Sequence, residues 1–202
     1  ILEIEEQCGV KPHWYPVCLN YLCYSLKRGK ITEFLASRLD STPNAIGKLT
    51  HLEKLILGNG SLEGCDSLFT NLTNLKELHL SSDKKMKHRT ATALPSSIKC
   101  LKNLEKLEIW DYHSLEALPD VFENLDSLKE IYVRDCEKFK HFPPSFGKLK
   151  HLKELRIENC ESLYSLPDLI GEINTLKDFS IEKCPITTIP ETFGNLDLDF
   201  MA

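Results

Sequence analysis

Apolar residues recur along this chain with a period of 24 residues. Leu101, Leu125, Leu149 and Ile173 occupy the first apolar position of four successive units. The same period holds at three later positions, which are occupied by Leu104, Leu128, Leu152 and Leu176, by Leu107, Ile131, Leu155 and Phe179, and by Ile109, Val133, Ile157 and Ile181. A fixed period of this length indicates a repeat architecture, in which each unit packs against its two neighbours.

Each unit carries one short strand. In Leu107-x-Ile109 the apolar residues alternate with polar ones, which is typical of a strand with one buried face. A single strand of five residues buries too little apolar surface to be stable, whereas parallel copies stacked on one another form a continuous core. We predict six strands, near residues 53–57, 76–80, 105–109, 129–133, 153–157 and 177–181.

The second half of each unit predicts a compact return segment. Several units reach a proline after an apolar residue, as in Leu118-Pro119, Phe142-Pro143 and Leu166-Pro167. Proline fixes φ and lacks a backbone donor, so it suits the start of a tight turn. Too few residues then remain for a stable α-helix, and we predict extended or 3₁₀ segments there.

The repeated spacing L-x-x-L-x-L-x-x-C/N is identified as the leucine-rich repeat. That resemblance implies an α/β solenoid, a right-handed superhelix with about six short parallel strands on its concave face and mostly 3₁₀ or extended segments on its convex side. The unit from Leu155 through Cys160 and Leu166-Pro167 to Gly171 resembles the C-terminal repeats of plant intracellular nucleotide-binding immune receptors. It is also similar to leucine-rich-repeat effectors of intracellular bacteria. The resemblance covers residues 45–196, and no G-x-x-x-x-G-K-[ST] motif occurs in the sequence.

We predict three segments. Residues 1–44 form a mainly helical N-terminal cap, because Ile31, Phe34, Leu35 and Leu39 have helical spacing and Thr32 suits an N-cap. Such a cap would cover the open apolar end of the first repeat. Residues 45–196 form the solenoid of about six repeats, each 23–29 residues long, and residues 197–202 form a short tail.

Composition excludes several classes of function. The net charge of −5 argues against a general nucleic-acid binder, which normally carries a basic surplus. No apolar run approaches the roughly 20 residues that span a bilayer, and no secretory leader is visible. The placement of the eight cysteines suits free thiols in a reducing compartment, so we expect a cytoplasmic protein, or one secreted into the host cell if it is a bacterial effector.

Three cysteines share one position of the repeat. Cys136, Cys160 and Cys184 are spaced 24 residues apart, where the chain turns out of the strand. A metal or redox ladder is one interpretation. We favour a structural one, in which each thiol is a small buried group that donates a weak hydrogen bond to a backbone carbonyl.

No catalytic or metal site is predicted. Cys8, His13, Cys18 and Cys23 have the composition of a zinc site, but structural zinc usually takes close C-x₂₋₄-C pairs, so we favour packing within the cap. The seven histidines are scattered and match no nucleophile motif. We therefore predict that the protein is not an enzyme and that it uses no cofactor.

The solvent-facing side of the strands, here called the concave face, is the predicted binding surface. If Leu107 and Ile109 point inward, then Lys106, Glu108 and Trp110 point outward. The same rule gathers aromatic and arginine side chains on the middle strands, and these residue types are enriched in interface hot spots. The candidate partner-binding residues are His79, Glu108, Trp110, Tyr132, Arg134, Arg156 and Glu158. Alternatively, Arg134 and Arg156 only pair across strands with Glu158 and Glu108.

A longer unit suggests a second candidate site. The unit from Leu72 to Leu101 has 29 residues, and its surplus contains Lys84, Lys85, Lys87 and Arg89. Insertions in solenoids emerge as loops, where binding often resides. This basic loop is either an electrostatic handle for an acidic or phosphate-bearing ligand or a solvated loop without a partner.

Taken together, the sequence predicts a non-catalytic protein-recognition module that binds a partner protein on its concave face. The resemblance implies an immune-receptor or pathogen-effector module. An alternative is an adaptor that presents a substrate to a ubiquitin ligase or phosphatase through its N-terminal region.

Overall fold

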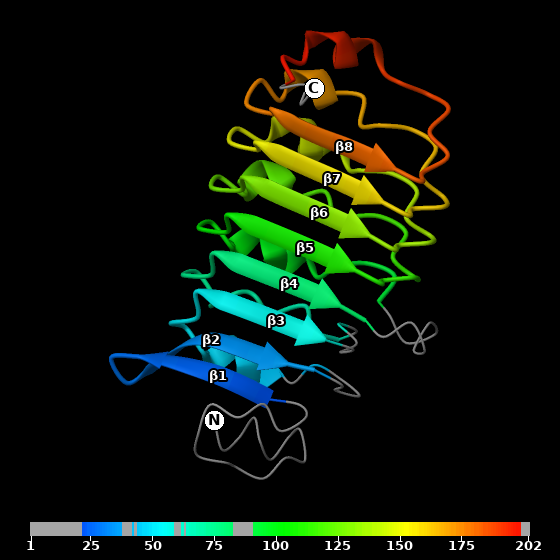
Figure 1. The fold of residues 1–202 in the computed structure, drawn as a ribbon. Coiled ribbons are helices and arrows are strands. Elements are labelled where there is room, and N and C mark those ends of the chain that lie inside the picture. Colours follow the sequence, from blue (N-terminus) through cyan, green and yellow to red (C-terminus); the bar gives the residue numbers. More distant parts are fainter. Residues whose placement is uncertain are drawn as a thin grey trace.

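A computed structural model of the chain describes residues 22–37, 42, 44–58, 62, 64–82 and 91–198. The strands form one eight-stranded sheet whose order follows the chain (Figure 1). They are β1 (Leu22–Lys27), β2 (Lys30–Ala36), β3 (Lys54–Gly58), β4 (Glu77–Ser81), β5 (Lys106–Trp110), β6 (Glu130–Arg134), β7 (Glu154–Glu158) and β8 (Asp178–Glu182). Strands β2 to β8 are parallel, and β1 is antiparallel to β2.

The six predicted strands are confirmed as β3 to β8, each one residue later than predicted. Within β5, Leu107 and Ile109 are fully buried, and Lys106, Glu108 and Trp110, which alternate with them, are half-buried, as the alternation requires. The shift arises because the hydrogen-bond ladder continues past the last buried residue. Asp111, for example, still donates its N–H to the carbonyl oxygen of Arg134, at 3.0 Å.

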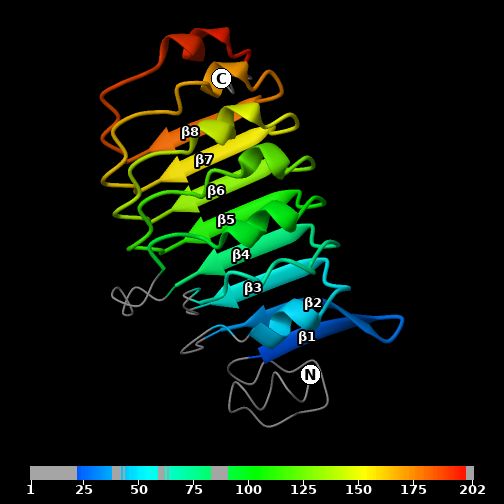
Figure 2. The ribbon, with the colours of Figure 1, turned by 180° about the vertical axis from the view of Figure 1, so that it is seen from behind.

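The convex side consists of short 3₁₀ segments, which confirms the prediction (Figure 2). They are η1 (Asn44–Lys48), η3 (Ser96–Cys100), η4 (Phe122–Asn124), η5 (Pro144–Lys148), η6 (Ile170–Glu172) and η7 (Glu191–Asn195). Pro95, Pro143 and Pro190 immediately precede three of them. The fixed φ of proline and its free carbonyl suit this position, and Phe146 donates its N–H to the Pro143 oxygen at 3.0 Å.

The core is a continuous apolar layer between the sheet and the 3₁₀ segments. It extends from Phe34 to Leu176, and most of its leucines are completely buried. Phenylalanines fill the space beneath the convex side, where the ring of Phe146 lies 5.5 Å from that of Phe122 and 4.5 Å from that of Phe142. Each repeat therefore contributes to the burial of its neighbours, as expected of a solenoid.

The helix predicted within residues 31–39 is wrong, because residues 31–36 belong to strand β2. β1 and β2 form a hairpin closed by Arg28 and Gly29, both at positive φ, which is the backbone that a two-residue turn requires. Phe34 and Ala36 alternate with more exposed residues and join the core, since β2 pairs with β3. Residues 1–21 lie outside the described part of the chain, and the division into a cap and a solenoid remains a prediction.

The last repeat is less well covered than the others. Side chains of β8 such as Phe179 and Ile181 are only half-buried, and Ile189 is 61% exposed. Within the described residues, the N-terminal part of the tail is held by an ion pair between Lys177 and Asp197, at 2.5 Å. The end of the stack thus presents apolar surface that the middle repeats bury.

Candidate protein-recognition surface

The register of the sheet aligns the outward side chains of β3 to β8 in three columns, as the alternation predicts. The first column is Lys54, Glu77, Lys106, Glu130, Glu154 and Asp178; the second is Ile56, His79, Glu108, Tyr132, Arg156 and Ser180; the third is Gly58, Ser81, Trp110, Arg134, Glu158 and Glu182. Strand β2 extends the first two columns with Glu33 and Leu35. The sequence prediction did not include these two residues, because it assigned them to a helix.

Glu108 stands at the centre of the second column and is held on both carboxylate oxygens. Its Oε2 lies 2.7 Å from His79 Nδ1 on β4, and its Oε1 lies 3.0 Å from Lys106 Nζ. The Glu108 side chain is only 14% exposed. Two partners and partial burial fix its orientation before any ligand arrives.

Trp110 packs against its neighbour instead of standing alone. Its ring centroid lies 4.2 Å from that of His79, and the two planes are 83° apart, which is the edge-to-face geometry that aromatic pairs favour. This contact gives the outward-pointing indole a packing role on the sheet. Trp110 remains half-buried, so it offers part of its apolar surface in a fixed position.

Tyr132 lies between two cations. Lys106 Nζ is 4.7 Å from the centre of its ring, and the guanidinium carbon of Arg156 is 5.8 Å away, both within the range of cation–π attraction. The Tyr132 hydroxyl donates to Glu130 Oε2 at 3.4 Å. Partial burial and the neighbouring carboxylates of Glu154 and Glu130 raise the pKa of Tyr132. Lys106 was not among the predicted binding residues. Its outward position in the first column, on the same strand as Glu108, could have identified it from the sequence.

The predicted arginine pairs are half right. Arg134 Nε lies 3.4 Å from Glu158 Oε2, as predicted. Arg156 instead binds Glu154 at 2.6 Å and Asp178 at 3.0 Å, because Glu108 lies two strands away, with Tyr132 between them. Both arginine side chains are 52% exposed, so these pairs stabilise the fold little and leave the guanidinium groups accessible.

The environment of His79 disfavours its charged form. Burial of the ring lowers its pKa, the positive charges of Lys54 and Lys106 act in the same direction, and the carboxylates of Glu108 and Glu77 oppose them. His79 Nε2 is buried and has no hydrogen-bond partner among the described residues. A neutral ring fits this site better than a charged one, because Nδ1–H donates to Glu108 and no buried N–H is then left without an acceptor at Nε2.

Acid is therefore expected to destabilise the protein through His79. A folded-state pKa below the unfolded value means that the unfolded chain binds more protons, so stability is lost as the pH falls below about 6.5. We expect the melting temperature to fall less between pH 7.5 and pH 5.0 in His79→Gln than in the wild type. His151→Gln, at an exposed position, is the matched control. Equal pH slopes for all three proteins would contradict the assignment.

The cysteine column has the predicted hydrogen bonds to backbone carbonyls, but only two of its three thiols are buried, because Cys184 in the last repeat is half-buried. Cys136 and Cys160 are completely buried, and their thiols contact the carbonyl oxygens of Arg134 and Glu158 at 3.4 and 3.6 Å. The Cys160 N–H points at Cys184 Sγ, 3.4 Å away. The neighbouring Cys136 thiol and burial raise the pKa of Cys160 to about 12. A thiol held in this form is a poor nucleophile and a poor metal ligand.

Other candidates lie partly outside the described residues. The basic loop of Lys84, Lys85, Lys87 and Arg89 is outside them, as are Cys8, His13 and Cys18, so these predictions remain as stated. In the ranges that the structure covers, no group of three His, Cys, Asp or Glu side chains could hold a metal ion. The helices in those ranges are all too short or too polar to cross a membrane.

Known proteins share this architecture. A family model described as R13L1/DRL21 leucine-rich repeats matches residues 66–160. A leucine-rich-repeat protein of Leptospira interrogans is 28% identical, with a TM-score of 0.66 over 80% of this chain and 40% of that chain. A chain of the PEPR1–AtPEP1 crystal structure is 20% identical, with a TM-score of 0.60 over 89% of this chain and 26% of that chain. The chain thus spans less than half the length of either protein. No curated protein matches the sequence.

Proposed function

We propose that this chain, which is a leucine-rich-repeat solenoid, is a non-catalytic recognition module that binds a partner protein on its concave face. The observation that carries the proposal is the central cluster on β4 to β7, defined by His79, Lys106, Glu108, Trp110, Tyr132 and Arg156. Leucine-rich-repeat folds are typically interaction modules, and this cluster places hot-spot residue types side by side on the strands of a rigid sheet.

The central cluster suits binding because its side chains are already oriented. Trp110 is held by His79, and Tyr132 is held by Lys106 and Arg156. Little side-chain freedom is then left to lose on association, which is a main cost of binding. We propose a partner with an apolar patch opposite Trp110 and Tyr132.

Charge indicates the orientation of the partner. On β7 and β8 the outward columns carry Glu154, Glu158, Asp178 and Glu182, against the single cation Arg156. Basic side chains of the partner would therefore face β7 and β8, since complementary charge steers association and fixes register.

A finer proposal concerns the biological setting. The resemblance of the unit ending at Leu166-Pro167 to repeats of plant intracellular immune receptors and bacterial effectors supports an immune-type or effector-type module. Thiols used as buried hydrogen-bonding groups, as in Cys136 and Cys160, support a reducing, cytoplasmic location.

The experiment is a quantitative capture from eukaryotic cell lysate, read by mass spectrometry. The bait variants are the wild type, the triple variant Trp110→Ala, Tyr132→Ala, Arg156→Glu, and a control that changes exposed lysines away from the concave face, Lys102→Ala with Lys150→Ala. Circular dichroism confirms that each bait is folded. We expect a partner whose enrichment falls at least tenfold with the triple variant, about 1.4 kcal/mol, and is unchanged with the control.

Two outcomes would contradict the proposal. A partner retained equally by the triple variant would place the binding site elsewhere and favour the adaptor hypothesis, provided that the partner is a ubiquitin ligase or phosphatase subunit. A partner lost equally with the triple variant and with the control would indicate non-specific capture.

A further inference from the structure

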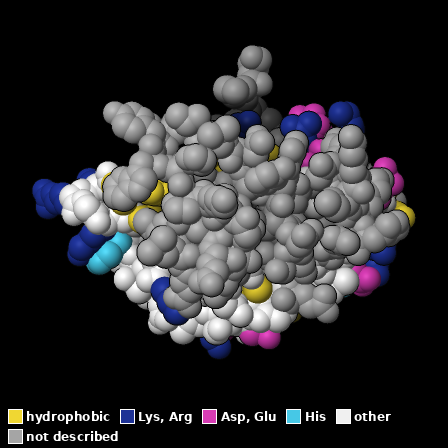
Figure 3. Space-filling view, turned by 90° about the horizontal axis from the view of Figure 1, so that it is seen from below, with side chains coloured by type: hydrophobic (Ala, Val, Ile, Leu, Met, Phe, Trp, Pro, Cys, Tyr) yellow, Lys and Arg dark blue, Asp and Glu magenta, His cyan; other side chains and the backbone are white. Residues whose placement is uncertain are grey.

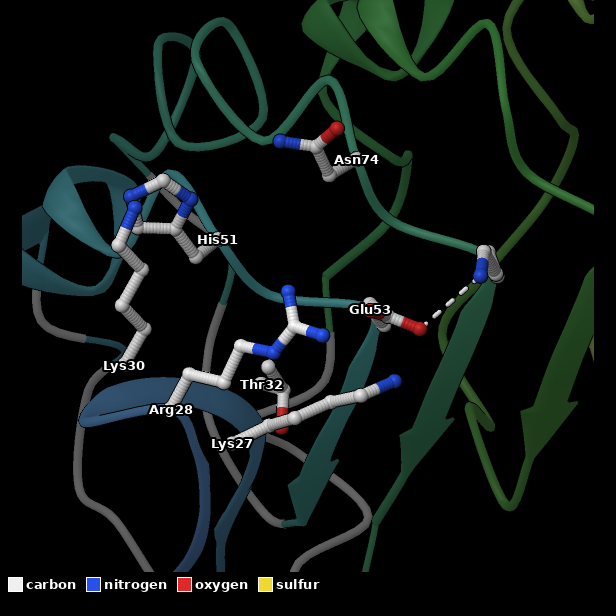
Figure 4. A pocket seen from close by; sticks show the side chains of 8 residues that line it. Lys27, Arg28, Lys30, Thr32, His51, Glu53 and Asn74 are labelled. Atoms are coloured by element: carbon white, nitrogen blue, oxygen red, sulfur yellow. Dashed lines mark hydrogen bonds and ion pairs between the residues drawn. The ribbon is translucent and has the colours of Figure 1, made fainter.

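A basic pocket opens beside the turn of the β1–β2 hairpin, at the end of the sheet opposite to β8 (Figure 4). Its volume is about 490 Å³. The lining comes from the hairpin and from the segments that lead into β3 and β4: Lys27, Arg28, Lys30, Thr32, His51, Glu53, Asn74 and Lys76. The pocket lies outside the central cluster of the concave face, so the proposed function does not use it.

The pocket concentrates positive charge on an acidic protein. Four of its side chains are cationic and one is a carboxylate, a formal charge of +3 with His51 neutral, whereas the whole chain carries −5. Glu53 is already engaged, because Lys76 Nζ lies 2.9 Å from its Oε2. This hydrogen bond and the charges of Lys76 and Lys27 lower the pKa of Glu53, which therefore stays ionised and balances only one of the cations.

The hairpin cations differ from most basic residues of the solenoid. Most exposed lysines there are matched to carboxylates on the neighbouring repeat, as in Lys129–Glu105 at 2.6 Å and Lys140–Glu116 at 2.9 Å. Among the described residues, no carboxylate lies within ion-pair distance of Lys27, Arg28 or Lys30. Figure 3, which views the stack from its β1 end, shows basic side chains gathered at one edge beside a histidine.

The backbone holds these cations close together. Lys27 and Lys30 face each other across the hairpin, and Arg28 is fixed between them at a φ of 54° in the turn. β2 is fastened to the next repeat, because Glu53 donates its N–H to the Thr32 oxygen at 2.7 Å. Asn74 is anchored through its side-chain amide to the Thr50 oxygen, at 2.9 Å. The hairpin thus places three cationic side chains around one pocket, where a bound anion would reduce their mutual repulsion.

We propose that this pocket binds a small polyphosphorylated molecule. Lys27, Arg28 and Lys30, which have no carboxylate partner within the described part of the chain, match a ligand that carries several negative charges. A guanidinium such as that of Arg28 can hold a phosphate in bidentate fashion. The volume fits one small molecule and is too small for a folded partner. Thr32 and His51 supply further polar groups for phosphate oxygens.

The test is isothermal titration calorimetry with inositol hexakisphosphate as the probe and myo-inositol as the uncharged control. We expect one binding site per chain on the wild type and at least tenfold weaker binding on Arg28→Glu with Lys30→Glu. The matched control is Lys150→Glu with Lys183→Glu, which makes the same charge change far from the hairpin and should leave the affinity within about twofold. Arg28→Asn with Lys27→Ser is a second pocket variant, because asparagine tolerates the positive φ of the turn.

Several results would overturn the proposal. Equal weakening by the pocket and control variants, or several weak sites per chain, would indicate general attraction of a polyanion. Loss of binding only in Lys84→Glu with Lys85→Glu would move the site to the basic loop. Binding to vesicles that contain phosphatidylinositol bisphosphate, unaffected by an excess of the free probe, would indicate a membrane surface instead of a small ligand. Melting curves of each variant confirm that the hairpin changes do not unfold the chain.

Discussion

Replacing Leu155 with aspartate is expected to unfold several adjacent repeats in one transition. Leu155 is completely buried on β7, with Ile131 of β6 on one side and Phe179 of β8 on the other. Loss of a buried leucine side chain costs about 2–5 kcal/mol, and an unpaired carboxylate in the core adds to that cost. The total exceeds about 5 kcal/mol, so the melting temperature should fall by more than about 10 °C.

The contrast between two variants isolates burial as the cause. Lys153→Asp introduces the same side chain two residues earlier, at an exposed position, and should leave the melting temperature within about 2 °C. Leu155→Ala should lie between them, at a loss of about 3 kcal/mol. Hydrogen exchange of Leu155→Asp should show protection lost together in β6, β7 and β8. An unchanged melting temperature for this variant would refute the register of the sheet.

The fold of the repeats could be predicted because the buried apolar positions alone determine the register of the strands. Leu107, Ile109 and their counterparts determine which face of each strand is buried, and the outward columns then follow from the alternation. The pairing of residues such as Trp110 and Arg134 in one column needed no knowledge of side-chain contacts. The cysteine column followed from the same period.

The hairpin could not be recovered from apolar spacing, because a short run such as Ile31 to Leu35 suits both a helix and a strand. The sequence did contain a signal for it. Lys27-Arg28-Gly29-Lys30 places a glycine where a two-residue turn needs positive φ, and the β-branched Ile31 and Thr32 favour a strand. Because this turn was not predicted, the basic pocket was not predicted either, since the pocket is formed by the hairpin together with the segments that lead into β3 and β4.

The contacts within the central cluster lie beyond sequence reasoning for a different reason. Glu108 has cations and a histidine within reach on several strands, and the choice among them depends on rotamers and on partial burial. Arg156 binds Glu154 and Asp178, whereas the sequence interpretation paired it with Glu108, which lies two strands away beyond Tyr132. The column position of a charged residue identifies its neighbours. Which neighbour forms the ion pair depends on side-chain rotamers and on the other charged groups within reach.

Replacing Gly171 with alanine is expected to destabilise the protein by about 3 kcal/mol, at the upper end of the usual cost of overpacking. Gly171 lies in η6, and a Cβ built on it would overlap the backbone carbonyl oxygen of Thr192 in η7. The Gly171 N–H also points at Thr192 Oγ1, at 3.4 Å. The overlap with the Thr192 carbonyl can be relieved only if the two 3₁₀ segments move apart. The melting temperature should therefore fall by about 6–12 °C.

The chain supplies its own control for this prediction. Gly194 follows Phe193 in η7 as Gly171 follows Ile170 in η6, but no heavy atom among the described residues lies within 4 Å of a Cβ placed on Gly194. Gly194→Ala should therefore be neutral or slightly stabilising, because alanine reduces the freedom of the unfolded chain. Equal losses for both variants would show that the glycines act through local backbone conformation. A loss confined to Gly171→Ala would show that close approach of consecutive 3₁₀ segments sets the requirement, which the sequence of a single unit does not reveal.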